Sequence, residues 1–93
     1  HALSGVERGI SKQFGGAYPV EIMAHTLRLF GAGVKVGVEC ATMALDCGAI
    51  PYGEDVIAVG GSRGGADAAI LIRPAHAAGI FETRIKEIIC KPR

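Results

Sequence analysis

"DVIAVGGSRGGADAAILIRP", residues 55–74, decides the fold class, because two short apolar runs flank a loop that contains four glycines. Each run is short and almost free of charge, which is typical of a fully buried strand. Residues 83–92, "TRIKEIICKP", mix apolar and charged side chains and predict a third strand, at an edge of the sheet. The second half of the chain is therefore predicted to form a small β-sheet.

Two helices are predicted near the start of the chain. Ser4 and Glu7 have the spacing of a capping box, and apolar residues then recur every four positions, so we expect a helix over 4–14. Pro19 is suited to the first turn of a second helix. The apolar stripe of this second helix consists of Val20, Met23, Leu27 and Phe30.

A third helix is predicted over 33–47, with Gly48 as the residue that ends it. It is rich in Ala and Val, and a helix that is apolar all round is typically a buried one. Three helices ahead of the first strand are unusual, since α/β domains alternate the two kinds of element. The order favours the back half of a larger fold, so we expect a single domain or half-domain that needs its other half.

Composition and charge exclude several classes of partner. The chain has 93 residues and a formal net charge of +1, with opposite charges interspersed apart from a mild basic cluster near the end. Nucleic-acid binding needs a concentrated basic face and a membrane anchor needs a polybasic segment, so neither partner is expected. No apolar run approaches the ~20 residues that span a bilayer. Three cysteines without a CxxC spacing predict buried free thiols and a cytoplasmic protein.

The glycine loop is the first candidate for a binding site. Gly61 and Gly64 let backbone N–H groups approach an anion, Ser62 offers a hydroxyl, and Arg63 offers a fork of charged donors. The spacing matches neither the dinucleotide-binding glycine motif nor the phosphate-binding loop of NTPases. Two interpretations stay open, a plain connection between strands and an anion site.

The start of the first predicted helix is the second candidate. Ser4 and Gly5 would supply a hydroxyl and a closely approaching backbone, and His1 would lie at the carboxyl end of a preceding strand. A helix N-terminus in that place binds anions readily. The alternative is a plain capping box without a ligand.

The sequence offers few candidates for catalytic or metal-binding residues. His76 lies in a loop after the second apolar run, and His25 lies at the border of the apolar stripe of the second helix. Each could take part in catalysis or have a purely structural role. No His and carboxylate residues have metal-ligand spacing, so no metal is expected. The sequence contains no G-x-S-x-G motif, and the catalytic residues of any reaction stay unknown.

Three segments carry a resemblance to a known family: residues 1–36, residues 44–61 ("ALDCGAIPYGEDVIAVGG") and residues 65–93 ("GADAAILIRPAHAAGIFETRIKEIICKPR"). Together they resemble the C-terminal half of the pyruvate kinase α/β-domain-like proteins, a mainly archaeal, prokaryotic family that stands alone without the catalytic barrel. The resemblance implies a three-layer α/β/α fold with a mixed sheet, like the C-terminal domain of pyruvate kinase. Only the second half of that fold would be present here.

The resemblance also implies a function and partners. It does not imply the catalytic activity of pyruvate kinase, because the catalytic barrel of that enzyme is absent from this family. It does imply a binding site for a phosphorylated small molecule or flavin mononucleotide (FMN). The missing N-terminal half or a second chain would complete the sheet, and a homo-oligomer is expected. We therefore expect a binding module, with a small-molecule enzyme that uses His76 or His25, or a structural assembly subunit, as alternatives. The residues assigned to the ligand are His1, Ser4, Gly5, Gly61, Ser62, Arg63 and Gly64.

Overall fold

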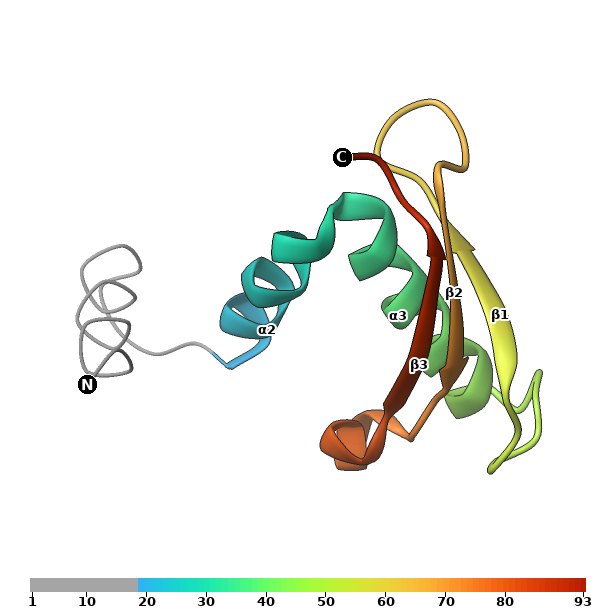
Figure 1. Ribbon diagram of the computed structural model, residues 1–93. Coiled ribbons are helices and arrows are strands. Elements are labelled where there is room, and N and C mark those ends of the chain that lie inside the picture. Colours follow the sequence, from blue (N-terminus) through green and yellow to red (C-terminus); the bar gives the residue numbers. More distant parts are fainter. Residues whose placement is uncertain (1–18) are drawn as a thin grey trace.

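The computed structural model describes residues 19–93, so the helix predicted over 4–14 lies outside the described residues. The described chain folds as helices packed on a β-sheet, which confirms the mixed α/β class (Figure 1). In chain order the elements are α2 (Pro19–Leu27), the 3-10 turn η1 (Arg28–Phe30), α3 (Ala32–Asp46), β1 (Val56–Gly60), β2 (Ala68–Arg73), the 3-10 segment η2 (Ala77–Glu82) and β3 (Arg84–Cys90).

The sheet is an antiparallel meander in the order β1-β2-β3. β1 pairs with β2 in an unbroken register from Val56 opposite Ile72 to Gly60 opposite Ala68. β2 pairs with β3 with two shifts of register. The three strands predicted from the sequence are present, and the last one lies at an edge as expected. Every pairing among the described strands is antiparallel, so a mixed sheet stays a prediction.

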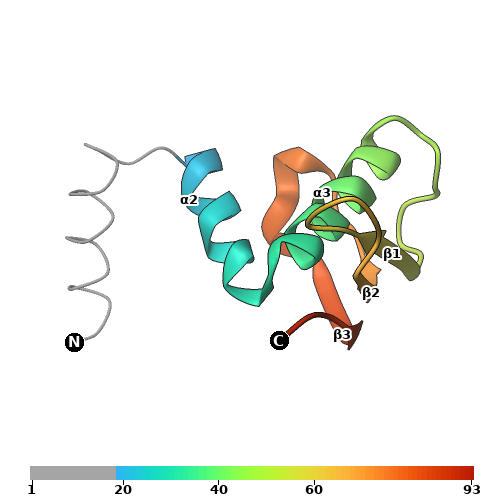
Figure 2. The same ribbon diagram turned by 90° about the horizontal axis from the view of Figure 1, so that it is seen from above.

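The core lies between α3 and one face of the sheet. Val34, Val38 and Ala41 of the helix pack against the strands, where Ile70 and Ile72 are fully buried. Burying one such aliphatic side chain contributes about 1.5–3 kcal/mol to folding. Among the described residues one helix layer covers the sheet, and α2 lies beyond α3, away from the strands (Figure 2).

Glycines allow α3 to approach β1 closely. A Cβ atom built on Gly60 would collide with the backbone oxygen of Gly33 and come within 2.9 Å of the backbone nitrogen of Gly37. Because backbone atoms cannot move aside as the end of a side chain can, a larger residue at position 60 would push the helix off the strand. These glycines therefore fix the position of the α3 start over the end of β1.

The C-terminal end of α3 agrees with the sequence prediction. Gly48 has a φ of 80°, in the left-handed region that favours glycine. Its N–H donates to Leu45 O at 3.0 Å, and the N–H of Ala49 donates to Ala44 O at 2.8 Å. These two bonds form a Schellman motif, which satisfies carbonyls that the helix itself leaves unpaired.

Two predictions about burial are wrong. α3 is buried on one face, and Met43 on its opposite face is 59% exposed, because no described element covers that side. The three cysteines, Cys40, Cys47 and Cys90, are exposed free thiols where buried ones were expected. Apolar composition does indicate which residues favour burial, but a second covering layer is needed to bury all sides of a helix.

The predicted stripe of the second helix is exposed at two of its four positions, Val20 and Phe30, whereas Met23 and Leu27 are half-buried. α2 ends at Leu27, which packs against the core, and continues as one 3-10 turn to Phe30. Val20 is 82% exposed and Phe30 is 45% exposed. No helix within residues 19–93 is long and apolar enough to cross a bilayer.

Candidate functional site

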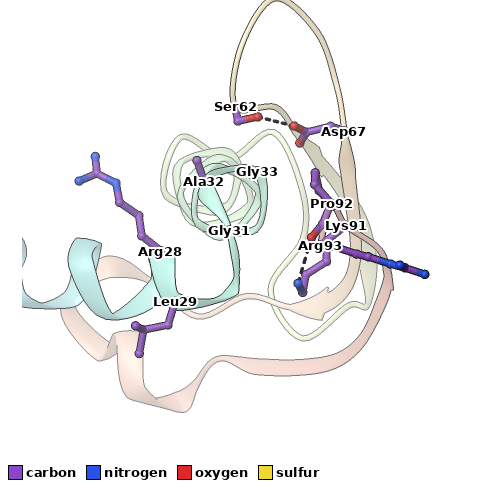
Figure 3. A pocket seen from close by; sticks show the side chains of 10 residues that line it. All are labelled: Arg28, Leu29, Gly31, Ala32, Gly33, Ser62, Asp67, Lys91, Pro92 and Arg93. Carbon is purple, nitrogen blue, oxygen red and sulfur yellow. Dashed lines mark hydrogen bonds between the residues drawn. The ribbon is translucent and has the colours of Figure 1, made fainter.

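A cavity of about 300 Å³ lies at the end of the sheet that carries the glycine loop. Three segments meet there: the turn that leads into α3, the loop between β1 and β2, and the residues after β3 (Figure 3). We call this space the loop cavity. Its lining side chains with charge or hydroxyl groups are Arg28, Ser62, Asp67, Lys91 and Arg93.

The glycine loop is folded by its own contacts. The N–H of Asp67 donates to Gly60 O at 2.9 Å, and the hydroxyl of Ser62 donates to Asp67 Oδ2. Gly64 has a φ of 61°, a conformation that residues with a Cβ adopt rarely. The loop is therefore a shaped connection between strands that holds the carboxylate of Asp67 in one place.

That carboxylate lies against the first turn of α3. Its Oδ1 is buried with no hydrogen-bond partner among the described residues, and it contacts Gly33 so closely that a Cβ there would collide with it. The helix has no side-chain cap at Gly31. A negative charge near a helix N-terminus is favourable, so Asp67 occupies the place where the helix itself would attract an anion.

Cationic side chains surround the same cavity. Among the side chains that line the cavity, Arg28, Lys91 and Arg93 are cationic and Asp67 is the one carboxylate, so the side chains alone give an excess of two positive charges. In Figure 3, Arg28 lies on one side of the α3 start and Arg93 on the other, and both extend away from it. Lys91 Nζ donates to Pro92 O at 3.1 Å. An anion bound here would depend on these side chains, since Asp67 already meets the helix.

The residues that the sequence assigned to a ligand are only partly placed. Ser62 lines the loop cavity, whereas Gly61, Arg63 and Gly64 belong to the same loop without lining it. Arg63 is exposed and makes no hydrogen bond or ion pair within residues 19–93. The remaining assigned residues, His1, Ser4 and Gly5, lie outside the described residues.

A second cluster lies at the opposite end of the sheet. His76 Nδ1 is 2.8 Å from Asp46 Oδ1, and the ring of Tyr52 stacks on the imidazole at 5.6 Å between centroids and 4° between planes. The N–H of Ala77 donates to both oxygens of Asp46 at 3.3 Å. If Nδ1 carries the proton that Asp46 accepts, Nε2 is the acceptor nitrogen, which is the arrangement of a general base.

The His76 cluster brings together residues that sequence reasoning did not connect. Asp46 ends α3, Tyr52 lies before β1, and His76 follows β2. No spacing rule links positions 30 residues apart, so only the fold reveals the pair. Half of the His76 side chain is exposed, and the contacts of Asp46 with Ala77 also serve to hold η2 against the end of α3.

Asp55 ties the three strands together at this same end. Its carboxylate accepts from Arg73 Nε at 2.9 Å and from Lys86 Nζ at 2.8 Å. The hydrogen bond from Lys86 lowers the pKa of Asp55 below its ordinary value of 3.8, desolvation acts against it, and Arg73 lowers it further. The carboxylate is thus held in its charged form by two neighbouring strands.

Comparison with protein-family models gave no match for this sequence. Within residues 19–93, no group of three or more His, Cys, Asp or Glu side chains is placed to hold a metal ion.

Proposed function

We propose that the chain is a binding module for a phosphorylated small molecule, which it holds in the loop cavity. The observation that carries the proposal is the excess of cationic side chains around a cavity of about 300 Å³ beside the glycine loop. That volume lies at the lower end of the range for small-molecule sites, roughly 300–1,000 Å³. A compact anion with few atoms fits such a space better than an extended ligand does.

Each lining group has a separate task in this proposal. Lys91 would supply a mobile point charge for a phosphate oxygen, and Arg28, whose guanidinium extends away from the α3 start in this structure, would have to turn toward the cavity to supply its fork of donors. Ser62 orients the loop through its bond to Asp67. Asp67 repels an anion from the helix start and so directs the phosphate toward the cationic side chains.

FMN is a special case of such a ligand. Its phosphate suits the cationic side chains, but its ring needs apolar or aromatic walls. Among the described residues that line the loop cavity, the apolar side chains are Leu29, Ala32 and Pro92, and none is aromatic. The lining therefore fits the phosphate end of FMN better than its ring, and we retain FMN as one ligand to test.

The resemblance to the pyruvate kinase α/β-domain-like proteins supports a phosphorylated ligand. It also supports the proposal that the described sheet and helix are part of a three-layer α/β/α fold with a mixed sheet. In that case further strands, from a missing N-terminal half or from a second chain, complete the sheet. The open edge of β1 and the exposed outer face of α3 are compatible with such an addition.

The test is a calorimetric titration with inorganic phosphate and, separately, with FMN. We expect Lys91→Ala to weaken phosphate binding about ten-fold, which corresponds to about 1.4 kcal/mol. Arg84→Ala is the matched control, because it removes an exposed cation at the other end of the sheet and should leave binding unchanged. Arg63→Ala tests the residue that the sequence assigned to the ligand. Because Arg63 does not line the loop cavity, this variant should bind phosphate like the wild type. Equal losses in Lys91→Ala and Arg84→Ala would contradict the proposal.

A small-molecule enzyme is the second candidate function, and the 2.8 Å contact between His76 and Asp46 favours it. In this function His76 Nε2 would move a proton while Asp46 orients the ring, as carboxylates do for catalytic histidines. A screen of phosphorylated substrates with the chain and with His76→Gln tests it. A turnover that His76→Gln retains would rule out this role for the histidine.

A further inference from the structure

β3 is the strand that α3 leaves uncovered. All seven of its residues are exposed, and the hydrophobic core takes its buried side chains from α3, β1 and β2. Ile88 pairs with Ile70 and Ile85 pairs with Ile72, and the two β2 partners are fully buried. Because paired residues point to the same side of a sheet, Ile85 and Ile88 lie on the face that α3 covers elsewhere. The apolar inner face of the sheet therefore extends past the helix.

A space of about 300 Å³ lies over this uncovered strip, and we call it the apolar groove. Its lining residues are Phe30, Val34, Ile85, Lys86, Glu87 and Ile88. Phe30 of η1 is 45% exposed, and Ile85 and Ile88 of β3 are 42% and 37% exposed. The groove thus joins the end of the α2–η1 segment to the inner face of β3, and its apolar side chains face solvent on both sides.

The α2–η1 segment carries exposed apolar side chains along its length. Val20, near its start, is 82% exposed, and Phe30, at its end, lines the apolar groove. The nine residues of α2 and the three of η1 span about 18 Å at the rise of a helix. A second helix of similar length could lie along this segment and reach the groove at its far end.

The chain itself contains such a helix in the sequence that leads into α2. Residues 4–14, predicted as a helix and outside the described residues, are eleven residues and would span about 16 Å. Their apolar stripe consists of Val6, Ile10 and Phe14. Four residues, 15–18, separate them from Pro19, which is within the 2–5 residues of loops that join antiparallel helices. A helix this short is marginal in water by itself, so it needs a surface to pack on.

We propose that residues 4–14 form a helix that folds back antiparallel to α2 and inserts Val6 into the apolar groove. The antiparallel order places Phe14 beside Val20, because both are next to the connecting loop. It places Val6 beside Phe30, at the end of the segment that lines the groove. The exposed stripe of α2 and the uncovered strip of β3 are then buried by the same chain.

This docking is independent of the ligand that we propose for the loop cavity. The apolar groove and the loop cavity share no lining residue. A chain that binds phosphate without docking residues 4–14 would contradict the docking alone, and a docked segment without phosphate affinity would contradict the ligand alone.

Nuclear Overhauser spectra of the 93-residue chain with ¹³C-labelled Ile, Leu and Val methyl groups test the docking. We expect cross-peaks between the methyl groups of Val6 and Ile88, and between the ring of Phe14 and the methyl groups of Val20. A sample that mixes labelled and unlabelled copies shows whether these contacts form within one chain. The proposal would be overturned by the absence of the cross-peak between Val6 and Ile88, or by contacts that form only between two copies.

Two variants separate docking from a general loss of structure. Ile10→Asn should abolish the cross-peak between Val6 and Ile88, because it places an amide in the apolar stripe. Lys12→Asn is the matched control, since position 12 lies on the opposite side of a helix from that stripe and the same residue is introduced. It should keep the cross-peak. The methyl signals of Val38, in the core under α3, should be unchanged in both variants. A cross-peak that survives in Ile10→Asn, or is lost in Lys12→Asn as well, would contradict the proposed stripe.

Discussion

The two ends of the sheet use charge in opposite ways. At the end where β2 finishes, charges are paired: Asp55 contacts Arg73 and Lys86, and Asp46 contacts His76. At the glycine-loop end, cations outnumber carboxylates around an open space. Charges that neutralise one another hold elements together, whereas an excess of one sign is available to a ligand. The comparison supports our proposal that the loop end is the binding end, whereas the paired charges at the other end hold the fold together.

The largest effect should come from Gly60, where α3 meets β1 at the loop end. Gly60→Ala should lower the free energy of unfolding by about 1–3 kcal/mol, because the added Cβ collides with the backbone of Gly33. Urea denaturation measures this loss. Gly65→Ala is the matched control, since a Cβ at that position has no neighbour within 4 Å. Equal stability of the two variants would mean that α3 is not held close to β1.

Asp67 should affect stability and binding in opposite directions. Asp67→Asn removes a negative charge beside the α3 start, which should cost about 0.3–1 kcal/mol of stability. The same change removes the carboxylate from the loop cavity, so phosphate should bind more tightly. Thermal unfolding and calorimetry measure the two effects. The control is Glu87→Gln, which removes an exposed carboxylate on β3 and should change neither the stability nor the phosphate affinity. Weaker phosphate binding in Asp67→Asn would contradict our account of the cavity.

Asp55 should show the smallest effect, and one that depends on pH. Because its pKa is lowered in the folded chain, the carboxylate stabilises the fold above its ordinary value of 3.8, and this contribution disappears as the pH falls through the lowered pKa. Asp55→Asn should therefore be less stable than the wild type near neutral pH, and the difference should shrink below about pH 4. Unfolding curves at several pH values test this, and a difference that grows on acidification would refute it.

Local patterns in the sequence were sufficient for most of the described elements. The runs around residues 55–74 became β1 and β2, and Gly48 ends α3 as expected. Each of these features depends on a few neighbouring residues. Burial was predicted less well, because exposure of Met43 and of the cysteines depends on which layers cover α3. No local pattern contains that information.

The candidate sites show the same limit. The sequence indicated the glycine loop, and Ser62 does line the loop cavity. It could not indicate Arg28 and Lys91 as neighbours of that loop, because they come from segments far apart in the chain. The basic cluster near the end of the sequence was the one available signal for Lys91. The pairing of Asp46 with His76 had no local signal.

The most direct test is a phosphate titration of the ¹⁵N-labelled chain at constant pH, followed by NMR. Our account predicts saturable shifts of the amide signals of Ser62, Gly33 and Lys91 at the loop end, and unchanged signals for Asp46 and Ala77 at the other end. Saturable shifts confined to Asp46 and Ala77, or no shifts at either end, would contradict the assignment of binding to the loop cavity.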